Sequence, residues 1–379
     1  MIKKELRELF SHYKNGTVYL NHAAISPMPN ATADAIRSFL DRRQNGPVED
    51  FENWMEILEE TRMFIAQLIH SESSEQITFM GNTSDGISAV AESLPWESGN
   101  EILLNTMEFP SNVQPFRALE RKGVSVRYIQ PEDGMVTPDM VRSAISPNTK
   151  LVSVSAVQYL NGFRADLEGI GVVCKEKNVW FVVDGIQALG ASDIDVKSAH
   201  IDALATGGHK WLMSPMGTGF LYLSNAMAKS MTPSKTGWLS VEEPWQLSNF
   251  DQPWLPVNQH LETGTMNMAG IIGMHASLKM FLDLGIKNIR NELLTLTDEL
   301  IDILKKRSGV MIITPAQQER RSGIITFKQR SDSEPDDIVQ LLKNQNIIIS
   351  AREGLFRISP HFYNTIEEIE TAVNQLFKV

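Results

Sequence analysis

Short apolar runs alternate with amphipathic stretches in most of the chain before Gly264. The runs are rich in β-branched residues and bounded by turn residues, which is typical of strands buried in a parallel sheet. They read EQITFM, NEILLNT, VSVRYIQ, KLVSVSAVQ, VWFVVDG and GFLYLS. Between them, stretches such as 50–70 and 166–178 place apolar residues at helical spacing. The alternation predicts an α/β fold with helices on both faces of a mainly parallel sheet.

After Gly264 the pattern changes to a run of helices followed by a run of strands. Two long helical stretches precede four short strands and a closing helix that begins at Ile366. A chain of 379 residues is long enough for two separate cores. We therefore expect a large α/β domain of residues 16–264 and a smaller α+β domain of residues 265–379, which the N-terminal helix of residues 1–15 completes.

Composition and charge narrow the class of protein. The apolar fraction of 42% and the charged fraction of 21% are those of a soluble globular protein. A net charge of -11 disfavours nucleic acid and anionic membranes as partners, because both repel an acidic surface. The one cysteine, Cys174, cannot form an internal disulfide, and no stretch has the pattern of a signal peptide or the length of a membrane span. We expect a cytoplasmic protein.

Ligands of open parallel sheets bind beyond the carboxyl ends of the strands, so the residues there are candidates for chemistry. After ITFM, the segment Gly81–Ser88 offers a glycine turn, the hydroxyls of Thr83 and Ser84, and the start of a helix. Free N–H groups at a positive helix end suit a phosphate. The alternative for this segment is an ordinary helix cap.

A carboxylate and an amine follow two other predicted strands. Asp184 comes directly after VWFVV, where an ionised carboxylate is costly to bury without a cationic partner; the alternative is a helix cap. Lys210 lies between the apolar segments DALAT and GFLYL, and the glycines around it allow a ligand to approach the backbone closely. The alternative for Lys210 is a surface lysine in a loop.

One ligand would use all three groups. Pyridoxal 5′-phosphate carries a phosphate for the Thr83 loop, a ring nitrogen for Asp184 and a carbonyl carbon for Lys210. A lysine that forms a Schiff base must lose its proton, which burial and neighbouring positive charge favour by lowering its pKa. A carboxylate at the ring nitrogen keeps a proton there, so that the ring accepts electrons from a substrate. These residues predict an enzyme that acts on an amino acid through this cofactor.

The chain also resembles a known family, the class V aminotransferases, within fold type I of the pyridoxal phosphate enzymes. Cysteine desulfurases, kynureninase and isopenicillin N epimerase belong to that family. The motifs that carry the resemblance cover nearly the whole chain and are YLNHAAISPMP, GNTSDGIS, MEFPSNVQPF, VQYLNGFRADLEGI, VDGIQALG, GGHKWL, GTGFLYL, LETGTMN and FRISPHFYNT. Among these motifs, VDGIQ followed by HKW at this spacing is a specific sign of the family.

The resemblance implies a set of site residues. Thr83 and His209 would hold the phosphate, Phe109 would stack on the ring, and Gln187 would bind the phenolic oxygen. Arg357 would bind the substrate carboxylate. The residues that the resemblance assigns to the cofactor are Asn82, Thr83, Phe109, Tyr159, Asp184, Gln187, Thr206, His209, Lys210 and Thr265.

Further expectations concern the neighbouring subunit and the rest of the pocket. In LETGTMN, Thr265 would reach the phosphate of a second subunit, which implies a homodimer with shared active sites. His22 would line the substrate pocket, with a hydrogen-bonded turn histidine as the alternative. The tryptophans within residues 237–254 are expected to pack the connection between the domains. The other histidines have no metal-ligand spacing, so no metal is expected.

Departures from the family pattern bear on the reaction. Gly207 stands where relatives commonly have a serine that binds the phosphate, so Thr206 or another hydroxyl is expected to substitute. Desulfurases use a mobile-loop cysteine shortly before the carboxylate-binding arginine, whereas SAREGLFRIS has none, and Cys174 is expected to be a buried small hydrophobe on a helix.

Transamination, the default of the family, is the expected reaction, and a lyase, hydrolase or epimerase reaction is the alternative. A protein of another class, a nucleotide-binding module in which Lys210 neutralises phosphate charge, is the second hypothesis. Such a module has no use for Asp184 aimed at a ring nitrogen opposite the lysine, which favours the enzyme.

Overall fold

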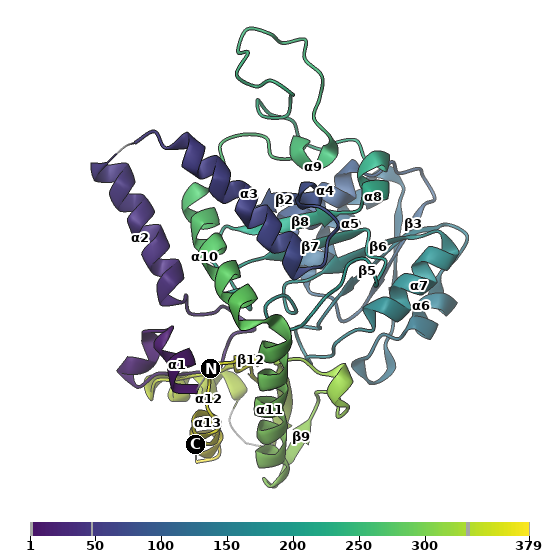
Figure 1. The fold of residues 1–379 in the computed structure, drawn as a ribbon. Coiled ribbons are helices and arrows are strands. Elements are labelled where there is room, and N and C mark those ends of the chain that lie inside the picture. Colours follow the sequence, from purple (N-terminus) through teal and green to yellow (C-terminus); the bar gives the residue numbers. More distant parts are fainter. Residues whose placement is uncertain (1–2, 47, 331–333, 379) are drawn as a thin grey trace.

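The computed structural model describes residues 3–46, 48–330 and 334–378. Its largest sheet has seven strands, which are β2 Ile77–Met80, β3 Glu101–Asn105, β4 Ser125–Ile129, β5 Thr149–Ser155, β6 Trp180–Asp184, β7 Ala203–Gly207 and β8 Gly219–Leu223. Their order across the sheet is β2-β8-β7-β6-β5-β3-β4 (Figure 1). The five strands from β7 to β4 are parallel, whereas β8 runs antiparallel to both neighbours. The predicted mainly parallel sheet is confirmed.

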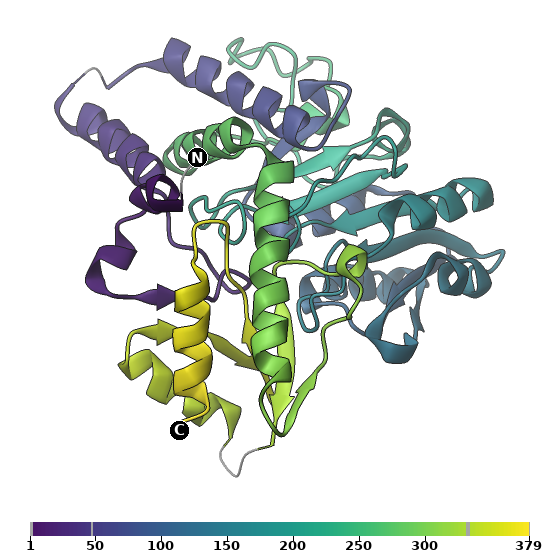
Figure 2. The same ribbon diagram turned by 60° about the horizontal axis from the view of Figure 1, so that its bottom comes forward.

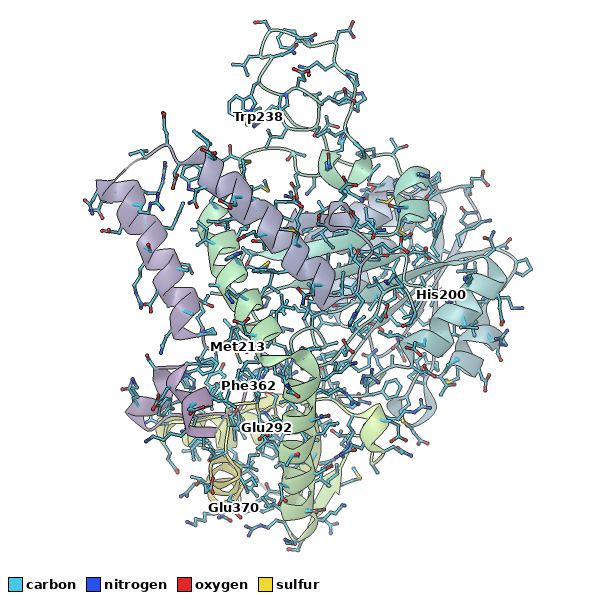
Figure 3. The ribbon with its side chains drawn as sticks, viewed as in Figure 1. His200, Met213, Trp238, Glu292, Phe362 and Glu370 are labelled. Atoms are coloured by element: carbon cyan, nitrogen blue, oxygen red, sulfur yellow. The ribbon has the colours of Figure 1, made fainter. Side chains whose placement is uncertain are left out.

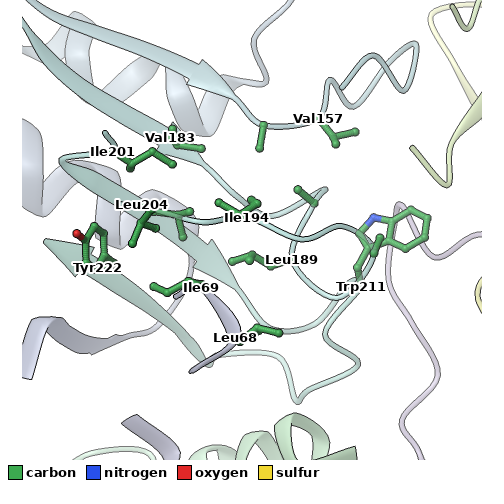
Figure 4. Close-up of a cluster of buried hydrophobic side chains, with 14 of the residues drawn as sticks. Leu68, Ile69, Val157, Val183, Leu189, Ile194, Ile201, Leu204, Trp211 and Tyr222 are labelled. Carbon is green, nitrogen blue, oxygen red and sulfur yellow. The ribbon is translucent and has the colours of Figure 1, made fainter. Parts of the chain in front are cut away.

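Helices cover both faces of this sheet, because successive strand residues point to opposite sides. In β6, Phe181 and Val183 join one apolar core, whereas Val182 joins the other. The first core, part of which Figure 4 shows, also contains residues of α3, α7 and α10. The helices of this part of the chain are α2 Asn30–Asn45, α3 Phe51–Leu68, α4 Thr83–Ser93, α5 Gln114–Arg117, α6 Pro138–Ala144, α7 Leu167–Lys177, α8 Asn225–Ser230, α9 Val257–His260 and α10 Met268–Leu284.

A smaller antiparallel sheet follows in the chain, with the strand order β12-β13-β10-β9. Helices α11 and α13 pack against each other beside it (Figure 2). Helix α13 begins at Ile366 as predicted, and Thr365 and Glu368 form its capping box. The elements are β9 Val310–Ile312, β10 Ile325–Gln329, β12 Ser350–Arg352, β13 Leu355–Ile358, α11 Ile286–Lys305, α12 Pro335–Asn344 and α13 Ile366–Leu376.

The N-terminal segment pairs with a strand near the end of the chain, beside the smaller sheet. Helix α1 spans Lys3–Glu8, and the short strand β1 Val18–Tyr19 pairs in parallel with β11 Ile347–Ile348. The first two residues of the predicted N-terminal helix lie outside the described residues. Helix α10 packs against α2 and α3, on the side of the large sheet. The proposed division at residues 264 and 265 stays a prediction.

The length and apolar character of the helices decide whether any of them could span a membrane. Within the described ranges, no single helix is long and apolar enough to cross a bilayer, and only α10 and α11 taken together, across a bend of 78°, meet the requirement by length and composition.

The tryptophans of the connection before α9 do not pack between the two layers, so this prediction was wrong. The segment of residues 232–256 projects away from the large sheet, with Trp238 at its base (Figure 3). Trp245 is 70% exposed and Trp254 is 61% exposed. The sequence pattern could not place them, because an aromatic-rich, Pro-containing loop packs inward or outward according to which surface faces it.

Candidate active site

A cavity of about 390 Å³ lies at the carboxyl ends of the parallel strands, where the sheet architecture places ligands. Eight of the predicted site residues line it, namely Asn82, Thr83, Phe109, Tyr159, Gln187, His209, Lys210 and Arg357. They come from six separate segments of the chain. The structure therefore brings together residues that the sequence linked only through strand ends and motifs.

The Lys210 side chain reaches the cavity from the loop between β7 and β8. The next residue, Trp211, is fully buried, and its Nε1 donates a hydrogen bond to Oε1 of Gln187 over 2.8 Å. This anchoring rules out a freely solvated surface loop. Burial lowers the pKa of the Lys210 amine below its ordinary value of 10.5, the charge of Asp184 opposes this, and the charges of Arg357 and Arg352 add to it. A lowered pKa increases the fraction of free, nucleophilic amine near neutral pH.

Asp184 ends β6 and is buried; it does not itself line the cavity, but Ile186 and Gln187, which follow it in the chain, do. Its Oδ1 accepts a hydrogen bond from the Ile186 N–H over 3.0 Å. Burial raises the pKa of this carboxyl, and the nearby charge of Glu108 raises it further, whereas Lys210 lowers it. Asp184 is therefore a carboxylate that binds a proton more tightly than one in water.

Sequence reasoning missed Glu108, whose carboxylate is buried beside this site. It accepts hydrogen bonds from the side chains of Asn105, Asn112, Ser155 and Gln158. Because these donors lie at the ends of β3 and β5 and on the segments that follow each strand, the network fixes the segment that carries Phe109. The only signal in the sequence was an acidic residue directly before Phe109 in MEFPSN.

The Gly81–Ser88 segment behaves partly as a cap and partly as a cradle. Asn82 caps α4, since its Oδ1 accepts a hydrogen bond from the Asp85 N–H over 3.0 Å. Thr83 is only 3% exposed, and its Oγ1 has no hydrogen-bond partner among the described residues. An unpartnered hydroxyl at a helix N-terminus that lines a cavity is a fitting donor to a phosphate. Ser84 donates to Ser111 over 2.9 Å, and both hydroxyls also line the cavity.

The residues expected around the ring line the same cavity. The Lys210 Nζ lies 5.6 Å from the centre of the Phe109 ring, which in turn meets Tyr159 edge to face. Gln187 uses one Nε2 hydrogen on the Ala23 carbonyl, so a second remains for a ligand oxygen. Burial lowers the pKa of His209, and the charge of Lys210 adds to this, which keeps its imidazole neutral.

One expectation about the phosphate, that the Thr206 hydroxyl replaces the missing serine, is not met by this arrangement. The Thr206 hydroxyl is buried outside the cavity and donates to the Gly207 carbonyl over 3.2 Å, so Thr206 does not replace the missing serine. A Cβ atom at Gly207 would lie 3.2 Å from Nδ1 of His209, so the imidazole takes the room that a serine would need. The hydroxyls of Ser84 and Ser111 are the better candidates.

Arg357 is 2% exposed and reaches the cavity from β13. Its Nε donates to the Ser350 hydroxyl over 3.2 Å and its Nη1 to the Tyr159 carbonyl over 2.8 Å. No described carboxylate forms an ion pair with it, Glu353 included. A buried guanidinium without a counter-ion favours an anionic ligand.

His22 and Thr265 lie elsewhere. Both ring nitrogens of the buried His22 are in hydrogen bonds of 2.8 Å, with the Ser359 carbonyl and the Tyr363 hydroxyl, which favours the turn histidine over substrate contact. Thr265 is exposed and lines a separate cavity of about 270 Å³ beside Gly264. An exposed Thr265 is accessible to another subunit, and its contact with the phosphate of that subunit stays a prediction.

Comparisons with known proteins agree with this geometry. Residues 18–371 match the family described as aminotransferase class-V. A probable cysteine desulfurase from Methanothermobacter thermautotrophicus is 28% identical over 93% of this chain and 92% of its own length. A Bacillus subtilis protein named uncharacterized aminotransferase YcbU is 27% identical over 99% and 97%. The crystal structure of the cysteine desulfurase CsdA from Escherichia coli covers 100% of this chain and 98% of its own, with a TM-score of 0.90 and 24% identity.

We predict that Thr83→Val weakens binding of pyridoxal phosphate without weakening the fold. A hydrogen bond to a charged group contributes about 1.5–3 kcal/mol, so the dissociation constant should rise by about tenfold or more. Without cofactor the variant should melt at the same temperature or higher, because an unpartnered buried hydroxyl is removed. Cofactor titration and thermal denaturation measure the two effects.

Thr78→Val is the matched control for this prediction. The Thr78 hydroxyl donates to the Asn258 carbonyl over 2.6 Å, so its loss should lower the melting temperature and leave cofactor affinity unchanged. Equal cofactor affinity in Thr83→Val and the wild type would contradict the phosphate cradle.

Proposed function

Because this chain belongs to the class V aminotransferase family, we propose that it is a pyridoxal 5′-phosphate-dependent aminotransferase that acts on an amino acid. The observation that carries the proposal is a lysine amine that lines the cavity and a buried carboxylate, Asp184, near enough that each shifts the pKa of the other. The unpartnered Thr83 hydroxyl at the start of α4 supports a phosphate-bearing cofactor at that cavity. When bound, the cofactor supplies an aldehyde that reacts with amines and a ring that accepts the electrons of a broken bond.

Asp184 and Lys210 have complementary tasks in this proposal. Asp184 would hold a proton on the ring nitrogen, because the negative charge of its carboxylate stabilises a protonated ring. Lys210 binds the cofactor covalently through Nζ. As a free amine, Nζ would move a proton at the α carbon of the substrate.

Arg357 orients the substrate. Its guanidinium is planar and pairs with a carboxylate through two parallel hydrogen bonds, which fixes direction as well as position. The contacts to Ser350 and Tyr159 leave Nη2 and part of the fork for a ligand. With the carboxylate held there, the α carbon of an amino acid faces the Lys210 amine across the cavity.

A lyase reaction is the second candidate, because several relatives are named cysteine desulfurases. Desulfuration through a protein persulfide needs a thiol at the substrate, and Cys174 is the only cysteine. It lines a cavity with Trp180 at the amino end of β6, whereas Asp184 is at the carboxyl end, roughly 13 Å along the strand. Burial raises the pKa of the Cys174 thiol to about 12, with a further contribution from Asp202. These features favour transamination over desulfuration.

We also propose that the protein is a homodimer. The loop of residues 232–256 exposes contiguous apolar side chains, in which Trp245 meets Trp238 and Phe51 edge to face and Phe250 is 95% exposed. Monomers rarely expose such patches. Trp238 lies against Gly264, next to Thr265, so a second subunit on this patch would meet the segment expected to reach its phosphate. A cytoplasmic location stays a prediction.

Lys210→Ala is expected to abolish covalent cofactor attachment and to lower turnover by at least about a thousandfold, since both the nucleophile and the proton carrier are lost. The visible absorption band and borohydride fixation of the cofactor to a Lys210 peptide report attachment. Lys150→Ala, at an exposed lysine of another cavity, is the control and should keep the band. Substantial turnover by Lys210→Ala would contradict the proposal.

Cys174→Ala is expected to change turnover by less than about twofold, because this side chain packs as an apolar group. Incubation of the wild type with cysteine should leave Cys174 unmodified in mass spectra. A persulfide on Cys174 during turnover would restore desulfuration as the reaction.

Substitution of both Trp245 and Phe250 by serine is expected to raise the dimer dissociation constant by at least about tenfold, because exposed aromatic residues dominate interfaces. The melting temperature of each subunit should change little, since both side chains lie in solvent. Sedimentation velocity measures the association. Leu341→Ser, at an exposed apolar side chain of α12, is the control, and a monomeric wild type would refute the dimer.

A further inference from the structure

A second guanidinium, that of Arg352, lines the same cavity as Arg357, and no motif in the sequence pointed to it. Arg352 ends β12, and the two-residue turn Glu353–Gly354 leads directly into β13. Both turn residues have positive φ, of 50° and 72°, as a tight hairpin turn requires. The hairpin thus holds Arg352 in a fixed relation to Arg357.

The pairing register places both arginines on one face of this hairpin. Ser350 is opposite Arg357, and Arg352 is opposite Leu355. Positions 350 and 352 share a face, as do positions 355 and 357, because side chains alternate along a strand. Arg352 and Arg357 are therefore diagonal neighbours on the hairpin, and the backbone positions of such neighbours are about 7–8 Å apart. Two positive charges at this separation repel each other unless an anion lies between or beside them.

The carboxylate of Glu353, in the turn itself, acts on Tyr159 together with both arginines but forms no ion pair with either. The Arg352 Nη1 donates a hydrogen bond to the adjacent Ala351 carbonyl, over 2.8 Å, and no described carboxylate forms an ion pair with the guanidinium. The alternative reading is a solvated surface arginine, since the side chain is exposed. Against it, Arg352 lines the cavity, and its charge is felt at the Lys210 amine, whose pKa it helps to lower.

Arg352 is the cavity cation to which the proposed function assigns no anionic partner. In the proposed function, Asp184 pairs with the ring nitrogen and the Lys210 amine becomes part of a covalent bond. The phosphate lies at the start of α4 beside Thr83, and Arg357 takes the α-carboxylate of the substrate. Of the cationic side chains that line the cavity, Arg352 is the one without a partner in this scheme.

We infer that the substrate is an amino acid whose side chain ends in a second acidic group, a carboxylate or a sulfinate, and that Arg352 binds this group. The inference rests on the proposed function and adds the class of substrate to it. Arg357 holds the α-carboxylate in the buried part of the cavity, and the side chain extends toward the exposed Arg352. The rigid hairpin sets the distance between the two acidic groups, so it selects among acidic side chains by length.

The test compares acids with their amides in the cofactor-loaded enzyme. Specificity constants are measured for aspartate against asparagine and glutamate against glutamine, and cysteine sulfinate is measured beside them to distinguish sulfinate from carboxylate. The wild type should prefer the acids. Arg352→Gln should lower the ratio of acid to amide by about ten- to a hundredfold, because a charge-assisted pair is lost.

Arg352→Lys keeps the charge and should restore most of the preference. Arg330→Gln removes a charge from an exposed arginine that does not line the cavity and should leave the ratio as in the wild type. Calorimetric titration with succinate and propionate, which carry no amine, gives a readout independent of turnover. Arg352→Gln should weaken succinate binding by at least about tenfold more than propionate binding.

The outcomes separate this inference from the proposed function. If the wild type turns over amides as well as acids, or if Arg352→Gln affects both equally, amino-acid chemistry stands and the second acidic group is refuted. If a cofactor-loaded wild type reacts with no amino acid at all, the proposed function fails and the inference falls with it. Arg357→Lys should impair acids and amides alike, which shows that the assay detects loss of the α-carboxylate contact.

Discussion

A lysine amine in the cavity and a buried carboxylate close enough to shift its pKa impose the main constraint on this structure. Neither charge is stable in an apolar interior by itself, so each needs the other or a ligand. The surrounding structure meets this demand with rigidity: Trp211 and Gln187 fix the lysine loop, and the Glu108 network fixes the segment opposite. The parallel strands bring the two groups to one edge, because β6 and β7 are neighbours in the sheet.

The features that could be predicted from the sequence depend on neighbouring residues or on a regular spacing of apolar residues. The strands, the closing helix and the residues after strand ends could be predicted, because an apolar run and the polar group that follows it are adjacent in the chain. Asp184, Lys210 and Thr83 belong to this class. Ser111, Glu108 and Arg352 do not, because their proximity to the cavity depends on how distant segments meet. A hydroxyl or a guanidinium in a loop carries no mark of the cavity that it will line.

The wrong or unsupported expectations have the same origin. Thr206 is near Lys210 in the chain, but strand geometry turns its hydroxyl away from the cavity. His22 lies in a motif typical of the family, yet Ser359 and Tyr363 satisfy both of its nitrogens. The aromatic loop was placed inward on hydrophobicity alone. In each case the missing information was the direction of a side chain, which the backbone of remote residues decides.

The pairing of β1 with β11 ties the order of synthesis to the order of assembly. A ribosome adds about 5–20 residues per second, so residues 18–22 wait roughly 15 to 65 s for their partners at residues 347–359. The large sheet is complete in the nascent chain by Leu223, long before the hairpin that carries Arg357 exists. A ribosome that stalled between these points would display the strand ends that carry Asp184 and Lys210 but not Arg357, the residue for which we propose binding of the substrate. On that proposal, competence to bind substrate is the last property that the growing chain acquires.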